Sequence, residues 1–319
     1  MNSPILLSLF SATCLGMFTY DINDSAFDTS APIPDTTYHK YCRNIYSQNG
    51  EDGLIEQLIK ELNIDKGTFC EFGASDGIRS SNTYNLMINH GFSGVSIEAD
   101  NESYELCKRN YGLYPNVVVW FGKVVYNEDD KTLDAWLSQS TLPHDFDILS
   151  IDIDGDDYYV WQGLNNYHPK IVIFETNSYR DPIFDELPQQ PSHEYNIDPL
   201  YYWHPARIAC GCSFITAVKL GLDKGYIPVA YTGNITFVRK DLIHLIKELP
   251  CVISDDPYAY VYLYSDLILW GNTWKTNTGL ILNGAIRDYY IKTGKKYIDV
   301  QWLEDELDHR INDHLSHLQ

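Results

Sequence analysis

The sequence predicts an α/β fold with a Rossmann-like, mainly parallel sheet and helices on both faces. Short apolar runs alternate with segments whose apolar residues recur at helical spacing. A glycine-rich turn, "GASDG", joins one of these apolar runs to the next helical segment. The chain has 319 residues, of which 44% are hydrophobic, so it can bury a large core. Alternation of this kind is typical of a parallel sheet covered by helices.

The alternating pattern begins near Tyr38. A helix is expected at 51–62, because Leu54, Ile55 and Leu58 share one face with other apolar residues, and the strand that follows ends at Glu71. The next elements are expected in the order helix 81–90, strand 93–100, helix 102–112, strand 116–125, helix 131–140, strand 146–154, helix 158–166 and strand 170–177. A helix at 213–225 and strands at 226–233 and 235–242 close the sheet, and the tail adds a strand-like run at 259–271 and a helix at 301–315.

Three parts are expected along the chain. Residues 1–37 combine an apolar start with an arm rich in Asp, Ser, Thr and Pro, residues 38–242 form the catalytic domain, and residues 243–319 form a C-terminal extension packed on it. The extension is expected to cover the sheet edge or to mediate homo-oligomer formation. Residues 178–212, rich in proline and aromatic side chains, are too long for an ordinary connection and predict a lid or binding loop.

Composition limits the partners and the compartment. The chain has 44 acidic and 23 basic residues and a formal net charge of -21, which disfavours nucleic acid as a partner. Its seven cysteines are scattered without CxxC spacing, which predicts reduced thiols and a cytoplasmic protein. The apolar segment 4–20 leaves a signal peptide or a membrane anchor as alternatives, and membrane contact is expected only through that segment.

Acids and amides stand at the ends of four predicted strands. Listed in chain order they are Glu71, Glu98 with Asp100, Asp152 with Asp154, and Glu175 with Asn177. In parallel sheets the carboxyl ends of the strands meet at one edge, and ligands bind beyond it. The sequence therefore predicts a polar ligand site at that edge.

The glycine turn suggests the kind of ligand. From Glu71 the spacing is E-x-G-x-x-D-G, which differs from the dinucleotide motif G-x-G-x-x-G and lacks the lysine of a P-loop. Two carboxylates near the turn would repel a pyrophosphate but suit a ligand with an amine and a sulfonium, which indicates S-adenosylmethionine. Glu98 stands 25 residues after Gly73, where an acid can accept hydrogen bonds from ribose hydroxyls, and Asp100 is the alternative.

Several motifs together resemble a known family. The runs "YSQNGEDGLIEQLI", "FCEFGASDGIRSSNTYNL", "GVSIEAD", "DFDILSIDIDGDDYYVWQGL" and "PKIVIFETN" resemble class I S-adenosylmethionine-dependent methyltransferases, closest to the FkbM-like branch. The resemblance covers about residues 46–240. It implies a seven-stranded sheet with an antiparallel last strand. It also implies O-methylation of a sugar or another hydroxylated small molecule or glycan.

The resemblance also implies site residues. The residues that would bind the cofactor are Glu71, Gly73, Ala74, Asp76, Gly77, Asn82, Glu98, Asp100 and Asp152. Among them, Asp152 would lie next to the transferring methyl group. The chain has Ile153-Asp154-Gly155 where FkbM-like chains more often have Val-Glu-Gly, so the acid is kept but shortened.

Methyl transfer to an alcohol requires removal of a proton, because an alcohol is a weak acid at neutral pH. The candidate catalytic residues are Asp152, Asp154 and His204, with His193 as a further candidate base. Alternatively, Mg²⁺ or Mn²⁺ would lower the pKa of the hydroxyl, with Asp152, Glu175 and Asn177 as ligands. The aromatic run Tyr201, Tyr202 and Trp203 would stack on a sugar, or else pin its own loop.

Two other functions fit part of the sequence. Asp152-Ile153-Asp154 has the D-x-D form with which many glycosyltransferases hold a metal and a nucleotide sugar, although this function does not account for "EFGASDG" or Glu98. A noncatalytic interaction module on the same fold is the second alternative. The acids present at all four strand ends favour an enzyme over such a module.

Overall fold

The computed structural model describes residues 39–177, 187, 211–247, 254–257, 260 and 264. These residues all belong to one compact unit, Ile33–Thr273. The arm at 1–37, most of the loop at 178–212 and most of the tail lie outside the described residues. None of the described helices is both long enough and apolar enough to cross a membrane. The apolar segment 4–20 lies outside the described residues.

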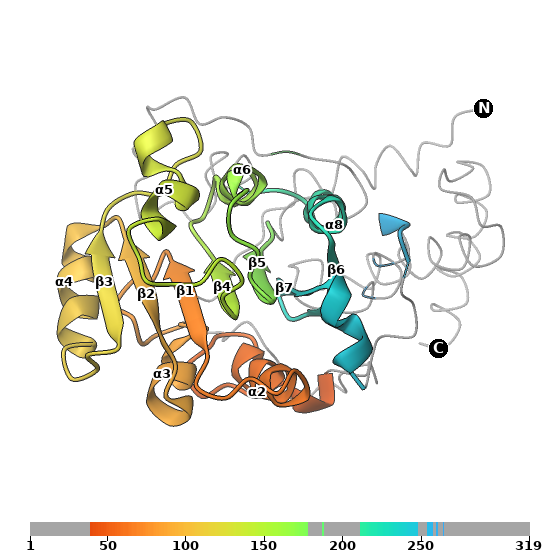
Figure 1. The fold of residues 1–319 in the computed structure, drawn as a ribbon, viewed down its shortest axis with the longest axis horizontal. Helices are drawn as coiled ribbons and strands as arrows, with labels where there is room; N and C mark the ends of the chain where they lie inside the picture. Colours follow the sequence, from red (N-terminus) through yellow and green to blue (C-terminus); the bar gives the residue numbers. More distant parts are fainter. Residues whose placement is uncertain are drawn as a thin grey trace, which may run out of the picture. The chain divides into compact units, whose positions relative to one another are not determined.

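Seven strands form one sheet in the order β3-β2-β1-β4-β5-β7-β6 (Figure 1). The strands are β1 (Thr68–Phe72), β2 (Ser93–Glu98), β3 (Val117–Phe121), β4 (Ile148–Ile151), β5 (Ile171–Glu175), β6 (Tyr226–Tyr231) and β7 (Asn234–Arg239). Strands β1 to β5 are parallel, whereas β7 runs antiparallel to both β5 and β6. The predicted fold class, including the antiparallel last strand, is confirmed.

Helices cover both faces of the sheet. They are α2 (Glu51–Glu61), α3 (Tyr84–His90), α4 (Asn101–Asn110), α5 (Leu133–Leu137), α6 (Asp157–Gly163) and α8 (Phe214–Asp223), with short 3₁₀ helices η1 (His39–Tyr41), η2 (Asp129–Lys131) and η3 (Lys240–Leu245). In Figure 1, α5, α6 and α8 lie on one face, and α2 and α3 lie on the other. The predicted layers are therefore present.

Some element ends differ from those predicted. The helix expected at 131–140 is divided into η2 and α5, because the hydroxyl of Thr132 accepts a hydrogen bond from the amide of Ala135 and begins a new helix. The strand expected at 116–125 ends at Phe121, and the helix expected at 158–166 ends at Gly163.

The core is centred on the middle strands. Every residue of β4 is buried, and β5 is buried up to Glu175. On the face of α6, the fully buried ring of Trp161 contacts Phe174, Tyr226 and Phe237, with centroid distances of 5.2, 5.7 and 5.0 Å. Aromatic packing of this kind fixes α6, and with it the loop that precedes α6, against three strands.

The amino ends of β1, β4 and β5 are closed by one carboxylate. Asp147 accepts hydrogen bonds from the backbone amide of Thr68 at 2.7 Å and from the ammonium of Lys170 at 2.7 Å. Its neighbours are therefore tied together across three strands. This edge is occupied by protein groups, which leaves the opposite edge, at the carboxyl ends, for a ligand.

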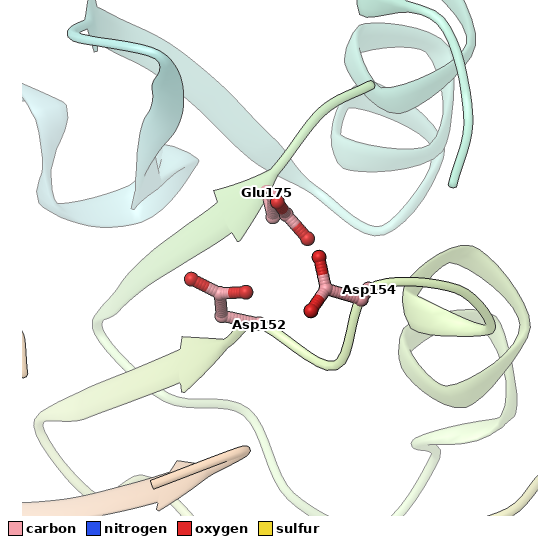
Figure 2. Close-up of side chains that lie close together, drawn as sticks. All are labelled: Asp152, Asp154 and Glu175. Atoms are coloured by element: carbon pink, nitrogen blue, oxygen red, sulfur yellow. The ribbon is translucent and has the colours of Figure 1, made fainter. Parts of the chain in front are cut away.

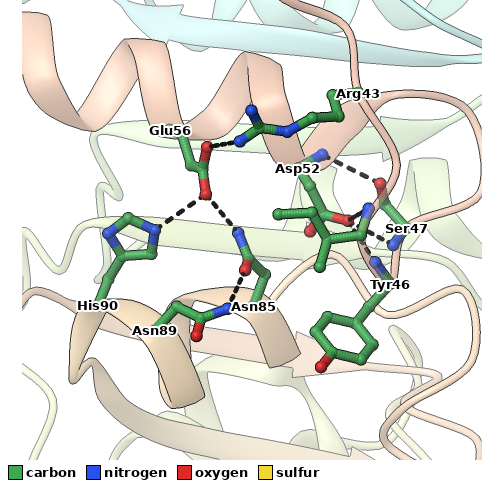
Figure 3. A network of polar contacts seen from close by, with 9 residues as sticks. Arg43, Tyr46, Ser47, Asp52, Glu56, Asn85, Asn89 and His90 are labelled. Atoms are coloured by element: carbon green, nitrogen blue, oxygen red, sulfur yellow. Dashed lines mark hydrogen bonds and ion pairs between the residues drawn. The ribbon is translucent and has the colours of Figure 1, made fainter.

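The segment before α2 folds around an acid (Figure 3). Oδ2 of Asp52 accepts hydrogen bonds from the backbone amides of Ile45, Tyr46 and Ser47 at 2.7, 2.6 and 2.7 Å. Three successive amides around one oxygen form an anion-binding concavity of backbone, filled here by the side chain of the chain's own helix. Asp52 therefore fixes the chain's entry into α2.

A second acid of α2 holds α3. Oε1 of Glu56 accepts a hydrogen bond from Asn85 at 2.9 Å and contacts Nε2 of His90 at 3.1 Å, both on α3, while Oε2 pairs with Arg43 (Figure 3). Partial burial of Glu56 opposes its ionisation, but the bonds from Asn85 and His90 outweigh that effect and lower its pKa. The two helices on this face are thus linked.

We predict that Asp52→Ala lowers the free energy of unfolding by about 2–4 kcal/mol, because it leaves three backbone amides without an acceptor. Asp52→Asn keeps one acceptor oxygen and is expected to cost less. Urea denaturation measures both. Asp65→Ala, at an exposed aspartate, is the control and should change stability by less than about 0.5 kcal/mol. Equal effects at positions 52 and 65 would contradict the role of Asp52.

Candidate functional site

The turn after β1 passes close to the end of β4. Gly73 has φ of +77°, and a Cβ at this position would lie 1.7 Å from the carbonyl oxygen of Asp152. Gly77 has φ of +80° and packs against Cys107 and Tyr111, whose hydroxyl donates to the carbonyl of Gly77 at 2.7 Å. Only glycine satisfies both requirements at position 73, a left-handed backbone and no side chain. The backbone of this turn therefore packs directly against the residue that follows β4.

Glu71 organises the rest of this turn. Its buried carboxylate accepts hydrogen bonds from the hydroxyl of Ser81 at 2.8 Å, the amide of Asn82 at 2.9 Å and the hydroxyl of Thr83 at 2.7 Å. Burial raises the pKa of Glu71, and the three donors offset part of that effect. Ser81 in turn accepts from the amide of Tyr84, so α3 begins at Tyr84 and not at the predicted residue 81.

Glu98, at the end of β2, joins two loops. Oε2 accepts from the amide of Ser75 at 2.7 Å, and Oε1 accepts from the amide of Asp100 at 2.7 Å. Each carboxylate oxygen has about two acceptor sites, so each keeps one for a ligand hydroxyl. Glu98 is 8% exposed, which leaves it within reach of the cavity but removed from bulk water.

Two other predicted acids act locally. Oδ1 of Asp76 accepts from the amides of Ile78 and Arg79, at 3.0 and 2.9 Å, and Oδ2 accepts from Nε of Arg79 at 2.7 Å. Asp100 caps α4, with Oδ2 accepting from the amide of Ser103 at 2.9 Å. That bond to Ser103 lowers the pKa of Asp100. Both side chains are thus engaged by their own loops.

Three carboxylates converge at the ends of β4 and β5 (Figure 2). Asp152, Asp154 and Glu175 each offer an oxygen within 4.8 Å of the others. The loop that carries Asp154, which has φ of 55°, is held by buried Asp157, whose two oxygens accept from the amides of Ile153 at 2.8 Å and Gly155 at 2.9 Å. Asp157 therefore presents Asp154 to the cluster.

Charge is concentrated at this cluster. Burial raises the pKa of Asp152 to about 7, and the charges of Asp157 and Asp154 add to the effect. Burial followed by the charge of Asp152 raises the pKa of Glu175 well above its ordinary value. The hydrogen bond between the two side chains lowers the pKa of Asp152 and raises that of Glu175. Burial and mutual repulsion therefore raise the pKa of both carboxyl groups.

A cavity of about 730 Å³ connects these parts. This volume falls within the range that holds small ligands and cofactors. Its lining comes from the ends of β1 to β4 and the loops that follow them, and consists of Glu71, Phe72, Gly73, Ala74, Ser75, Arg79, Ser80, Ser81, Asn82, Ile97, Glu98, Ala99, Ser103, Gly122, Lys123, Val124, Ser150, Asp152, Ile153, Asp154, Gly155 and Asp156.

The predicted site residues fall into three groups. Those that line the cavity are Glu71, Gly73, Ala74, Asn82, Glu98, Asp152 and Asp154. Asp76, Gly77 and Asp100 shape its loops, and Glu175 does not line the cavity but lies beside Asp152 and Asp154. The backbone amide of Asn177 donates to the carbonyl of Cys212 at 2.9 Å. His193, His204, Tyr201, Tyr202 and Trp203 lie outside the described residues.

Sequence reasoning missed three residues of this site. Asp157 was hidden within "DIDGDD", where spacing does not distinguish a loop anchor from a ligand. Arg79 and Lys123 line the cavity but were not singled out, because a site for a cationic ligand predicts acids. A signal for Arg79 existed: it lies three residues after Asp76, a spacing at which opposite charges meet in a tight turn.

No family model and no curated protein matches the chain. Solved structures that resemble it include the N-terminal domain of EvdMO1 in the presence of SAH and D-fucose (12% identity, 59% of this chain, 82% of that chain, TM-score 0.37). Another is a SAM-dependent methyltransferase from Aquifex aeolicus (13% identity, 57% of this chain, 86% of that chain, TM-score 0.34). A third is PKMT2 from Rickettsia typhi (14% identity, 35% of this chain, 21% of that chain, TM-score 0.27). The chain thus spans about a fifth of the length of PKMT2.

We predict that Gly73→Ala destabilises the protein by about 3 kcal/mol or more, because the methyl group would meet the carbonyl of Asp152 in a backbone conformation that alanine avoids. Gly163→Ala is the matched control, since a Cβ at Gly163 meets nothing within 4 Å. It should be neutral or stabilise α6 by up to about 1 kcal/mol. Thermal unfolding measures both variants. A Gly73→Ala protein as stable as the Gly163→Ala protein would contradict the close approach.

Proposed function

We propose that the protein is an S-adenosylmethionine-dependent methyltransferase. The observation that carries this proposal is a cavity at the carboxyl edge of a parallel sheet, lined by carboxylates from the ends of β1, β2 and β4. Carboxylates gathered in a partly dry cavity favour a cationic ligand and disfavour a phosphate. When bound, S-adenosylmethionine supplies a methyl group on a positively charged sulfur.

Residues of this chain fit the cofactor. Glu98 would accept hydrogen bonds from ribose hydroxyls with the acceptor sites that Ser75 and Asp100 leave open. Gly73 lets the turn pack against the backbone of Asp152, and Glu71 holds that turn in place at the cavity wall. Asp100, because it caps α4, is a weaker candidate for the ribose than Glu98.

The acceptor proposed is a hydroxyl of a sugar or another small metabolite. Asp152 is the proposed base: its pKa of about 7 means that much of it is ionised near neutral pH and that it still binds a proton well enough to take one from a hydroxyl. Glu175, which lies beside Asp152 in the cluster, would hold that carboxylate in position. The proton that the hydroxyl loses would thus stay on Asp152 until it passes to solvent.

A divalent metal also fits the cluster. Asp152, Asp154 and Glu175 supply three hard oxygen ligands, the donor set that Mg²⁺ and Mn²⁺ prefer. Asp154 joins the set proposed from sequence, which had Asn177 as its third member. A bound metal would lower the pKa of the acceptor hydroxyl and orient it.

Calorimetric titration tests the function against its alternatives. Wild-type protein is titrated with S-adenosylmethionine, S-adenosylhomocysteine and a panel of nucleotide sugars, with and without Mg²⁺ or Mn²⁺. Saturable binding of the first two ligands supports the methyltransferase. Binding of a nucleotide sugar alone, dependent on metal, would replace it with a D-x-D glycosyltransferase, and no binding of any of these ligands would favour an interaction module.

We predict that Glu98→Gln weakens binding of S-adenosylhomocysteine on the order of tenfold, because it removes the charge that strengthens bonds from hydroxyls. Asp100→Ser is the control: serine keeps the cap of α4, and affinity should change by less than about twofold. Calorimetry gives both affinities, and circular dichroism melting reports any loss of fold. A larger loss in Asp100→Ser would transfer the ribose contact to that residue.

We also predict that Mn²⁺ raises the melting temperature of the wild type and binds with an electron paramagnetic resonance signature of the protein-bound ion. Asp154→Asn is expected to weaken this binding by about tenfold or more, since one anionic ligand is lost. Asp130→Asn, at an exposed acid distant in sequence, is the control. Equal Mn²⁺ affinity in the wild type and Asp154→Asn would rule out this cluster as the metal site.

A further inference from the structure

Two basic residues line the cavity together with five acids. Arg79 comes from the turn after β1, and Lys123 follows β3, whereas the acids that line the cavity are Glu71, Glu98, Asp152, Asp154 and Asp156. The ligand proposed above is cationic at its sulfur but ends in an amino acid with a carboxylate. An anion among carboxylates requires a cation beside it. Either Arg79 or Lys123 is therefore needed to bind the carboxylate of the ligand.

Sheet order decides between them. Glu98 ends β2, which lies between β3 and β1, so Lys123 and Arg79 follow strands on opposite sides of the proposed ribose contact. In the ligand, the adenine and the sulfur extend from opposite ends of the ribose. The sulfur must face Asp152, which follows β4 on the far side of β1. The amino acid attached to that sulfur is consequently on the side of Arg79, and the adenine is on the side of Lys123.

Arg79 is already oriented by a neighbour. Its Nε donates to Oδ2 of Asp76 at 2.7 Å, and its side chain is otherwise 85% exposed. Within the described part of the chain, neither Nη group of Arg79 has a recorded partner, and two Nη donors match the two oxygens of a carboxylate. We propose that Arg79 binds the carboxylate of the methionine part of the cofactor and that Asp76 positions Arg79. Asp76, expected from sequence to hold the cofactor itself, would then act only through Arg79.

This role of Arg79 rests on the proposed function, and a pair of matched ligands tests the role and the function separately. S-adenosylmethionine and decarboxylated S-adenosylmethionine differ by the carboxylate alone. Calorimetry on Arg79→Ala should show S-adenosylmethionine weakened about tenfold, or about 1.4 kcal/mol, and the decarboxylated ligand weakened less than about twofold. Arg79→Lys should recover part of the loss, because a lysine keeps the charge without the paired donors. The side chain of Arg79 is exposed, so its removal leaves the core intact, and melting curves check the fold of each variant.

Lys123→Ala is the control, and it should affect both ligands to the same extent. A selective loss of S-adenosylmethionine in Lys123→Ala would place the carboxylate at the other base and overturn the proposal, as would equal losses of both ligands in Arg79→Ala. Asp76→Asn should give a smaller selective loss, absent when Arg79 is already alanine, whereas an additive loss would contradict its positioning role. Wild-type protein that binds neither ligand would remove the proposed function and this inference together.

Discussion

Buried carboxylates without a cationic partner organise the loops of this protein. An ionised carboxylate removed from water is costly unless hydrogen-bond donors surround it. Here the donors are the chain's own backbone amides: Asn82 donates to Glu71, Ser75 donates to Glu98, and Ile153 donates to Asp157. Each loop is therefore folded around its acid. The cavity exists because these loops are held apart in this way at the carboxyl edge of the sheet.

The same constraint explains what the sequence could predict. Apolar runs gave the strands, and parallel pairing then required their polar ends to meet, so Glu71, Glu98 and Asp152 were found from pattern alone. Bonds within a loop were not predictable, because an acid that caps a helix and an acid that binds a ligand have the same spacing. Asp100 and Asp76 are such cases.

Contacts between distant segments were also beyond reach. Glu51, at the start of α2, accepts hydrogen bonds from Thr232 at 3.1 Å and Asn234 at 3.2 Å, at the turn between β6 and β7. Nothing in "NGEDG" indicates a partner so far along the chain. These bonds hold the amino end of α2 against the turn between the antiparallel strands β6 and β7. The motif "YSQNGEDGLIEQLI", assigned to the catalytic domain by resemblance, thus has a structural role: it joins α2 to the last strands of the sheet.

The buried acids at this edge differ in whether backbone amides of the chain bond to them. Glu71 and Asp157 are more deeply buried than Asp152, and donors of their own loops bond to both oxygens of each carboxylate. In the described part of the chain, no backbone amide is recorded as a donor to Asp152, whose hydrogen bond is with another acid, Glu175. A carboxylate without backbone donors in a partly buried site binds a proton or a cation more readily than neighbours that have such donors. Proton transfer or metal binding is therefore better assigned to the ends of β4 and β5 than to the end of β1, although acids stand at all three.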